Sequence, residues 1–202
     1  MKDVRPTSGR VISALFSILG GKVEGAEFLD LFAGTGRVGI EAMKRGARSV
    51  FVESVKSRAD DIRKVTQNPS VGKDDPSVSL RSTSPFTQGR QGQYRAPCKG
   101  GEGHEMARGS LVLSLEIRRA VSWLIKREMK FDIIFADPPY NSGWCDTFPA
   151  IPNLSALFAD DAVMVIEHSA REPLTLTVNP NSLEVMSSRE YGETCLTFLK
   201  ML

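Results

Sequence analysis

Cysteine and histidine are scarce in this sequence, which limits the disulfide and metal chemistry that it can support. Three cysteines, Cys98, Cys145 and Cys195, and two histidines, His104 and His168, are spread over 202 residues. The cysteines are odd in number, and none of these side chains forms a CxxC pair or another metal-ligand spacing. We therefore expect no metal site, and free thiols in a reducing cytoplasm.

Long apolar runs and a strong charge excess are also missing. No stretch approaches the roughly 20 apolar residues that cross a bilayer, and the first ten residues lack the apolar core of a signal peptide. The formal net charge is +2, with 26 Lys and Arg against 24 Asp and Glu. The missing apolar runs predict a protein without a membrane partner, and the small net charge leaves room for a local basic patch that binds nucleic acid.

Strands and helices alternate in the first third of the chain. Residues 10–19 have apolar side chains at helical spacing, and residues 26–32 form a short apolar strand before a glycine-rich turn. A helix over 38–46, a strand over 49–53 and a polar helix over 54–68 are expected next. This alternation is typical of a doubly wound α/β sheet.

The regular pattern resumes in the second half. It predicts a strand, an amphipathic helix, a buried strand that runs into a loop, another buried strand and a closing pair of strands. These are expected at residues 111–115, 116–129, 131–140, 162–168, 183–192 and 193–202. We therefore predict a Rossmann-like, doubly wound and mostly parallel sheet with a C-terminal antiparallel strand pair, in a single domain over 1–202.

Residues 68–110 interrupt this alternation. The segment is rich in Gly, Pro and Ser, has no sustained period, and contains prolines at positions 69, 76, 85 and 97. A stretch of this kind inside a compact domain is usually disordered or a functional loop. We expect a flexible insertion that is dispensable for catalysis. The alternative is an RNA-binding loop in which arginines alternate with Phe86 and Tyr94.

A glycine-rich turn follows the strand at 26–32. Gly34, Gly36 and Gly39 have the spacing GxGxxG, which allows a tight turn and a close approach of the backbone to a ligand. The motif alone also fits dinucleotide enzymes, which hold a pyrophosphate at the helix N-terminus. The glycines therefore predict a cofactor site without identifying the cofactor.

Acidic residues around this turn favour a cationic cofactor. Asp30, with Phe32 after it, would repel a pyrophosphate but favours the ammonium and sulfonium groups of S-adenosylmethionine. Glu53, at the end of the next strand, can accept hydrogen bonds from both ribose hydroxyls, and Glu116 is a candidate to border the adenine. The alternative is that Asp30 caps a helix and Glu53 is a solvated strand end. The predicted cofactor-binding residues are Asp30, Phe32, Gly34, Thr35, Gly36, Gly39, Glu53 and Glu116.

The loop Asp137-Pro138-Pro139-Tyr140 follows a strongly apolar strand, at the sheet edge where α/β proteins bind ligands. The exocyclic amine of a base is a weak nucleophile, because its lone pair is delocalised into the ring. The Asp137 carboxylate and the Pro138 carbonyl can accept its two N–H bonds and favour an attacking geometry. The prolines stiffen the loop, and Tyr140 offers a face on which an extruded base stacks. The loop predicts methyl transfer to a base amine.

Four separated segments are shared with a known family. They are RPT with RV and ALFSIL near the N-terminus, LDLFAGTGRVGIEAMKRGA with FVE, FDIIFADPPY, and VIEHS with YGET near the C-terminus. With these segments the chain resembles the bacterial small-subunit ribosomal RNA guanine-N2 methyltransferases of the RsmD type. The glycine turn and DPPY occur in many amino-methyltransferases, whereas the RPT segment and the YGET ending are narrower signals.

The resemblance implies the class I fold of S-adenosylmethionine-dependent methyltransferases, with that cofactor as methyl donor. It implies the N2 amine of a guanine as acceptor, in ribosomal RNA or an assembling small ribosomal subunit. By the same motifs, residues 137 to 140 would hold the base, and Arg5 and Arg10 would contact RNA. The alternatives are an adenine-N6 methyltransferase on DNA or RNA, and a catalytically silent RNA-binding module.

Overall fold

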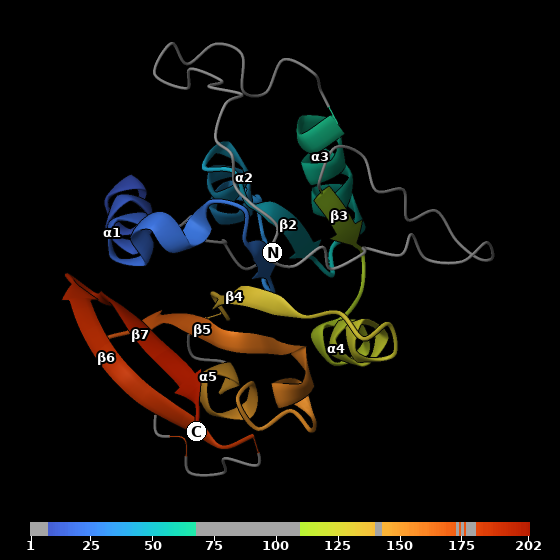
Figure 1. The fold of residues 1–202 in the computed structure, drawn as a ribbon. Helices are drawn as coiled ribbons and strands as arrows, with labels where there is room; N and C mark the ends of the chain where they lie inside the picture. Colours follow the sequence, from blue (N-terminus) through green and yellow to red (C-terminus); the bar gives the residue numbers. More distant parts are fainter. Residues whose placement is uncertain (1–7, 68–109, 140–142, 173, 175, 177–180) are drawn as a thin grey trace, which may run out of the picture.

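A seven-stranded sheet forms the centre of the molecule. The computed structural model describes residues 8–67, 110–139, 143–172, 174, 176 and 181–202. The strands are β1 (Glu27–Asp30), β2 (Arg48–Val52), β3 (Ser110–Leu113), β4 (Phe131–Ala136), β5 (Phe158–Ser169), β6 (Leu183–Tyr191) and β7 (Thr194–Met201). They lie side by side in the order β3-β2-β1-β4-β5-β7-β6 (Figure 1).

The first five strands of the chain are parallel to one another, and β7 is antiparallel to its neighbours. β1 pairs with β2 and β4, β2 with β3, and β4 with β5, all in parallel. β7 is antiparallel to both β5 and β6. The chain order reverses at β1, which has β2 on one side and β4 on the other. The predicted doubly wound sheet with a C-terminal antiparallel pair is confirmed.

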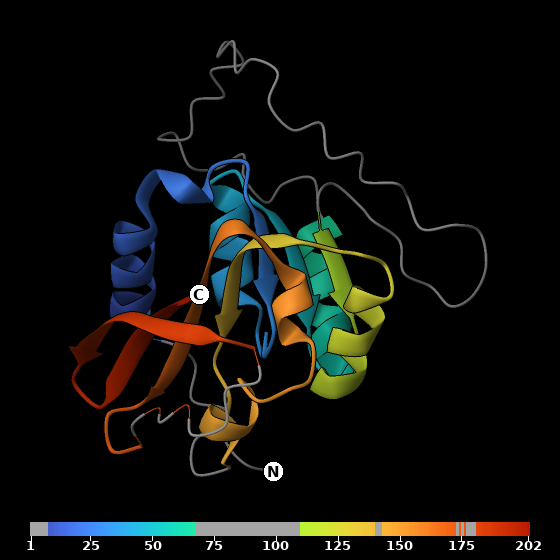
Figure 2. The same ribbon diagram turned by 60° about the horizontal axis from the view of Figure 1, so that its bottom comes forward.

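Helices cover both faces of this sheet (Figures 1 and 2). On one face lie α1 (Gly9–Leu19), the 3-10 helix η1 (Gly20–Val23), α2 (Arg37–Lys44) and α3 (Lys56–Gln67). On the other face lie α4 (Ile117–Ile125), α5 (Trp144–Thr147) and the 3-10 helix η2 (Leu154–Leu157). The molecule therefore has three layers, as expected for a sheet whose parallel strands are apolar on both faces.

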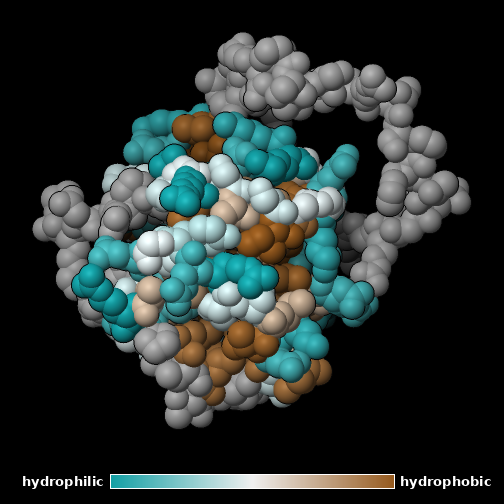
Figure 3. Space-filling model, turned by 90° about the vertical axis from the view of Figure 1, so that its left-hand side faces the viewer, coloured by the Kyte–Doolittle hydropathy of each residue, from teal (hydrophilic) through white to brown (hydrophobic). Residues whose placement is uncertain are grey.

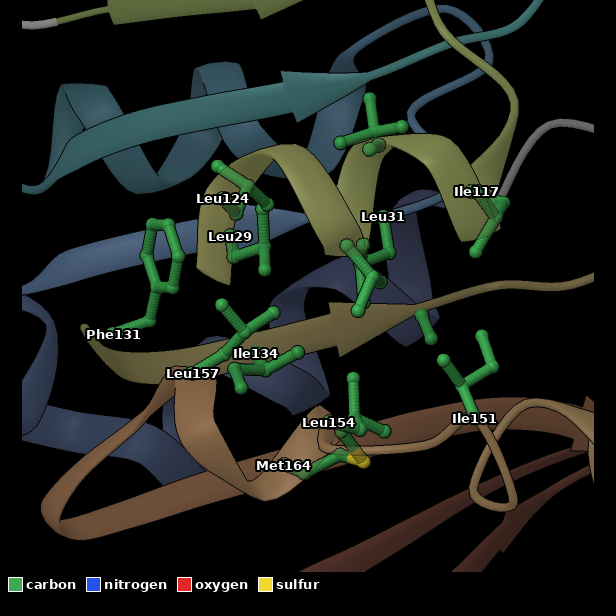
Figure 4. Packing of buried hydrophobic residues seen from close by; sticks show 14 of the residues in the cluster. Leu29, Leu31, Ile117, Leu124, Phe131, Ile134, Ile151, Leu154, Leu157 and Met164 are labelled. Carbon is green, nitrogen blue, oxygen red and sulfur yellow. The ribbon is translucent and has the colours of Figure 1, made fainter. Parts of the chain in front are cut away.

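The larger apolar core lies between the sheet, α4 and η2. Side chains of β1 and β4, including Leu29 and Ile134, meet Leu124 of α4 and Leu157 of η2 there (Figure 4). All four of these side chains are fully buried. Burying an aliphatic side chain of this size contributes about 1.5–3 kcal/mol, so this cluster fixes α4 firmly on the sheet.

α1 begins and ends where its sequence predicts. The Ser8 hydroxyl oxygen accepts a hydrogen bond from the Val11 N–H over 3.3 Å, and the chain leaves the helix at Gly20 with a φ of 53°. Phe16 on the buried face of α1 stacks on Phe28 of β1, with ring centroids 6.3 Å apart. The amphipathic pattern of residues 10–19 therefore becomes a helix packed on the second face of the sheet.

β5 is longer than the sequence pattern indicates. The apolar run predicts a strand from residue 162, whereas β5 begins at Phe158, which pairs with Phe131. Asp160 and Asp161 are exposed at the point where the β4–β5 register shifts, and Asp161 has a φ of 61°. These two polar residues at an irregular position interrupt the apolar pattern and hide the start of the strand.

The predicted insertion lies largely outside the described residues. Residues 68–109 are not described, so the flexibility expected for this segment stays a prediction. Its last residue, Ser110, is buried and is the first residue of β3. No helix in the described part of the chain is long and apolar enough to span a bilayer.

The side of the molecule that carries α1 and β6 has a mostly hydrophilic surface with separate apolar groups (Figure 3). The exposed large apolar residues of these two elements are Ile18, Val185 and Met186. β6 is an edge strand, and its register against β7 shifts between Val185 and Ser187. An irregular edge of this kind disfavours pairing with a strand of another chain.

Candidate active site at the carboxyl edge of the sheet

The carboxyl ends of β1 and β4 lie side by side where the strand order reverses. Asp30, the last residue of β1, is in register with Phe135, and the Leu31 N–H donates to the Phe135 carbonyl oxygen over 2.9 Å. Asp137 directly follows the last residue of β4. Two of the predicted site acids therefore project from neighbouring strands, at the edge where doubly wound sheets bind ligands.

Asp30 is a buried carboxyl group. Its side chain is 1% exposed, and its Oδ2 accepts a hydrogen bond from the Gly39 N–H over 3.1 Å. Burial raises the pKa of Asp30 from the usual 3.8 to about 7; the hydrogen bond from Gly39 opposes this rise, and the negative charges of Asp137 and Glu53 add to it. The three predicted acids therefore share one electrostatic environment.

The Asp30–Gly39 hydrogen bond also has a structural role. Gly39 is the third residue of α2, so its N–H is one of those that the helix itself leaves without a partner. Asp30 therefore caps α2 from the end of β1, as the alternative interpretation of the sequence supposed. The capping contact uses one carboxylate oxygen and is compatible with a role in the site.

Glu53 follows β2 at the same edge of the sheet. The Ala33 N–H donates to the Val52 carbonyl oxygen over 3.0 Å, which holds the glycine turn beside the end of β2. Glu53 is buried, and its Oε1 accepts from the Val55 N–H over 2.7 Å, while Arg58 lies 4.0 Å from its Oε2. Glu53 is thus not a solvated strand end. A contact with a ribose stays a prediction.

The glycine turn has two structural requirements that only glycine meets. Gly36 precedes α2 with a φ of 76°, a left-handed conformation that other residues rarely adopt. At Gly39, an added Cβ would overlap the ring of Phe51, which is fully buried on β2. Gly39 therefore allows close helix–strand packing. Gly34 and the exposed Thr35 form the turn itself, and cofactor contacts of these residues stay predictions.

Phe32 lies in an aromatic group that the sequence did not reveal. Its ring meets the edges of Trp144 and Phe148, with centroid distances of 5.6 Å and 5.9 Å. The guanidinium of Arg118 lies 5.9 Å from the centre of the Trp144 ring. Two features of the sequence could have indicated this group: an aromatic residue shortly after DPPY, and an arginine in the first turn of α4. Contact of Phe32 with a cofactor stays a prediction.

Glu116 caps α4. Its carboxylate Oε2 accepts from the N–H groups of Arg118 and Arg119 over 3.1 Å and 3.4 Å. The residue is exposed and follows β3 by three positions, at the same edge of the sheet as Glu53. This position is compatible with the predicted place beside an adenine, which stays untested.

The described part of the catalytic loop consists of Asp137, Pro138 and Pro139. Asp137 is half-buried, Pro138 is buried and Pro139 is exposed. Tyr140 and Arg5 lie outside the described residues. Arg10, the other predicted RNA contact, is exposed in the first turn of α1. RNA contacts of the two arginines stay predictions.

The arrangement favours a positively charged ligand. Carboxyl groups that follow or end β1, β2 and β4 meet at one edge; burial is the main cause of the raised pKa of Asp30, and repulsion from Asp137 and Glu53 adds to it. A pyrophosphate would add negative charge to this site, whereas a cation would lower the repulsion. Within the described ranges, no group of three or more His, Cys, Asp and Glu is arranged to hold a metal ion.

Comparison with known proteins identifies the family. The profile of a family described as conserved hypothetical protein 95 matches residues 1–89 and 109–200 of the chain. The chain belongs to this family. The two matched parts include every predicted site residue, and they leave out residues 90–108 of the irregular segment.

Relatives from two organisms confirm the resemblance that the motifs indicated. Ribosomal RNA small subunit methyltransferase D of Haemophilus influenzae is 23% identical over 192 residues, which are 95% of this chain and 80% of that protein. YlbH of Bacillus subtilis, whose name describes an rRNA methyltransferase, is 26% identical over 199 residues, which are 98% of this chain and 88% of that protein.

Several solved structures share the fold of this chain. yhhF of Escherichia coli, described as a methyltransferase, has a TM-score of 0.64 and 21% identity, and the match covers 98% of this chain and 88% of that one. An RNA methyltransferase of Salinibacter ruber, solved with S-adenosyl-L-homocysteine, has a TM-score of 0.58 and 11% identity, with 96% and 92% covered. The fold is that of the class I methyltransferases.

Proposed function

We propose that this protein is an S-adenosylmethionine-dependent methyltransferase that methylates the exocyclic N2 amine of a guanine in small-subunit ribosomal RNA. The observation that carries the proposal is the convergence of Asp30, Glu53 and Asp137 at one edge of the sheet. Asp30 and Glu53 suit a cationic nucleoside, and Asp137 begins the segment after β4, followed by the buried Pro138 and the exposed Pro139.

The residues at the end of β1 and β2 fit the proposed cofactor. A positive charge near Asp30 would relieve the repulsion from Glu53 and Asp137 that raises its pKa. The Glu53 carboxylate, held by the Val55 N–H, would accept hydrogen bonds from the ribose hydroxyls. S-adenosylmethionine, when bound, supplies an activated methyl group. The Salinibacter ruber neighbour with S-adenosyl-L-homocysteine supports this choice, because that compound is what remains after methyl transfer.

The loop after β4 would orient the acceptor. The Asp137 carboxylate accepts one N–H of the exocyclic amine, and the Pro138 carbonyl oxygen accepts the other. These two contacts would orient the lone pair of the nitrogen, and the negative charge of Asp137 would offset the positive charge that develops on it. Proline at 138 and at 139 restricts the backbone, so the carbonyl keeps its direction without an entropic cost on binding.

Ribosomal RNA as the substrate rests on the relatives. The Haemophilus influenzae relative is named for methylation of the small ribosomal subunit, and YlbH is named for rRNA methylation. Both matches cover 95% or more of this chain and therefore extend well beyond the shared cofactor motifs. The guanine N2 amine, in free or assembling small-subunit RNA, is proposed as the acceptor because it is what the motif resemblance implies.

Nucleoside analysis tests the proposal directly. Purified protein is incubated with S-adenosylmethionine and small-subunit ribosomal RNA from a strain that lacks the modification, and the digested nucleosides are analysed by mass spectrometry. We expect N2-methylguanosine. N6-methyladenosine would replace the guanine acceptor with adenine, and the absence of any methylated nucleoside, in free RNA and in assembled subunits, would refute methyl transfer to ribosomal RNA.

A further inference from the structure

The exposed side of α4 and the turn after it carry several cations. Residues 117–130 contain five Lys and Arg and one acid, Glu128. The buried residues of the helix, Ile117, Ala120, Val121 and Leu124, all face the core. The cations occupy the opposite, exposed side; they are Arg118, Arg119, Lys126, Arg127 and Lys130.

On the other face of the sheet, several cations in α3 and at the end of α2 pair with acids one turn away. The pairs are Arg45 with Glu41 at 3.0 Å, Arg63 with Asp60 at 2.6 Å, and Lys64 with Asp61 at 2.9 Å. Across the described residues, no carboxylate forms an ion pair with the five cations of α4 and its turn. Within the part of the chain that the structure describes, their positive charge is therefore not neutralised by an ion pair.

An aromatic ring lies among these cations. Arg119 and Trp123 are spaced by four residues and lie on one side of α4, and Arg127 lies in the turn just after the helix. The Arg127 guanidinium lies 3.5 Å from the centre of the Trp123 ring. Stacking of this kind holds a guanidinium in place while its N–H groups remain able to donate at the edge, which suits phosphate oxygens.

The cationic side of α4 begins close to the candidate active site. Arg118 lies over the Trp144 ring, and Trp144 contacts Phe32, two residues after Asp30. Glu116, the predicted neighbour of the adenine, caps the same end of α4. An extended polyanion that follows the helix would therefore reach the edge of the sheet where Asp137 stands.

We infer that this cationic face of α4, made of Arg118, Arg119, Lys126 and Arg127, binds the phosphate backbone of the RNA that carries the target base. The inference rests on the proposed function. A nucleic acid fits better than an acidic protein segment, because its charges repeat at regular intervals along an extended chain, as suits several cations that form no ion pair within the described residues. The face would position the RNA, while the loop after β4 selects the base.

A pair of double variants with equal loss of charge tests the inference. Arg119→Ala/Lys126→Ala removes two cations of the face, neither of which stacks on an aromatic ring in the described structure. Lys22→Ala/Lys44→Ala is the matched control, because both lysines are exposed and belong to elements on the opposite face of the sheet. The probe is an unmethylated transcript of small-subunit ribosomal RNA. Its dissociation constant is measured by fluorescence anisotropy over a range of salt concentrations.

The α4 variant should bind the transcript about tenfold more weakly at 0.1 M salt, and the slope of log affinity against log salt should be smaller by about two. The KM for RNA should rise with little change in kcat, and the affinity for S-adenosylmethionine should be unchanged. The control should stay within about twofold of the wild type, since its lysines do not lie along the RNA path.

Other results overturn the inference. Equal RNA affinity of the α4 variant and the wild type would show that α4 does not contact the backbone, and would direct attention to an acidic protein partner. An equal loss in the control would show a general effect of charge. A wild-type protein that binds the transcript but methylates no ribosomal RNA would refute the proposed function alone, because the binding comparison does not depend on methyl transfer. A wild-type protein that binds neither the transcript nor assembled small subunits would refute both.

Discussion

The three site acids have different surroundings, so single substitutions should separate cofactor binding from methyl transfer. Asp137 stands in the loop after β4, where it would meet only the acceptor. Glu53 is fixed at the end of β2 by the Val55 N–H. Asp30 is buried against the start of α2. Loss of each carboxylate should therefore change a different measurable quantity.

Asp137→Ala should abolish nearly all methyl transfer and leave the affinity for S-adenosylmethionine largely unchanged. Removing a preorganised group of this kind typically costs about 10²–10³ in kcat, and the acceptor amine is absent when the cofactor binds alone. Calorimetric titration gives the affinity, and transfer of a tritiated methyl group to ribosomal RNA gives the activity. Retained turnover would contradict the assigned role.

Glu53→Ala should weaken binding of S-adenosylmethionine by about 1.5–3 kcal/mol, the contribution expected of hydrogen bonds to a charged group. Glu53→Gln is the matched control, because its amide oxygen can still accept from the Val55 N–H and keep the local turn. The loss of affinity that remains in the Gln variant would measure the contribution of the negative charge. Unchanged affinity in both variants would exclude Glu53 from the cofactor site.

Asp30 should make the stability of the protein depend on pH. Because the pKa of Asp30 is about 7 in the folded chain against the usual 3.8, the folded state keeps a proton that the unfolded state loses between these values. The free energy of unfolding should therefore fall as pH rises through this window, by about 4 kcal/mol in total. Urea unfolding at pH 5 and at pH 8 should show about 2.5 kcal/mol of this change, because the rest is lost below pH 5. Asp30→Asn, which retains an acceptor for the Gly39 N–H, should show a flatter pH dependence, and an equal dependence in both proteins would contradict the raised pKa.

At the scale of elements, the contact between α2 and β2 depends on the missing side chain of Gly39. Gly39→Ala should lower the free energy of unfolding by about 1–3 kcal/mol, because the added methyl group would overlap the buried Phe51 ring. Gly21→Ala is the control, since no atom lies within 4 Å of its added Cβ. Chemical denaturation measures the free energy of unfolding of both variants. Similar stabilities would show that the two elements can move apart at no cost.

Elements could be predicted where one face of a segment is apolar over several residues. The strand before the glycine turn and the helix α1 follow from such runs, and both are present. Elements with short or mixed patterns were missed. α5 spans only Trp144–Thr147, and the start of β5 is masked by Asp160 and Asp161. A few residues carry too little periodicity to identify a helix or strand.

Side-chain contacts between distant elements were also beyond prediction. His168 looks isolated in the sequence, yet its Nε2 lies 2.8 Å from the Thr197 hydroxyl oxygen, because β5 pairs with β7. The buried Asn181 amide donates to the carbonyl oxygens of Pro149 and Ile151 over 2.7 Å and 2.9 Å. Partners about 30 residues apart become visible only once the topology is known.

At the scale of the whole molecule, topology explains which part of the site the sequence could predict. Asp30, Glu53 and Asp137 are far apart in the chain, but each is at or just past the end of a parallel strand, and such ends share one edge of the sheet. The contact between Phe32 and Trp144 depends instead on how α5 packs. The cationic face of α4 could not be predicted either, because the ion pairs that its side chains form or lack are known only from the folded structure.

The boundary of the family match suggests where the irregular segment can be shortened. The profile leaves out residues 90–108, which contain Arg90, Arg95, Lys99 and Arg108 with Tyr94 among them, and two acids. We predict that a short Gly-Ser linker in place of 90–108 leaves cofactor affinity and rRNA methylation within about twofold of the wild type. The segment has little apolar surface to bury, and the free energy of loop closure changes slowly with length.

The competing hypothesis is that the arginines and Tyr94 of this segment bind RNA, since alternating cations and aromatic rings suit single strands. A shortened protein that folds and binds S-adenosylmethionine but no longer methylates ribosomal RNA would favour it. A second protein, with a Gly-Ser stretch as long as residues 90–108, separates the loss of side chains from the change in loop length. If only the short version loses activity, the length of the connection matters. If both lose it, the side chains of 90–108 contact the substrate, and the cationic face of α4 is one of two RNA-binding regions.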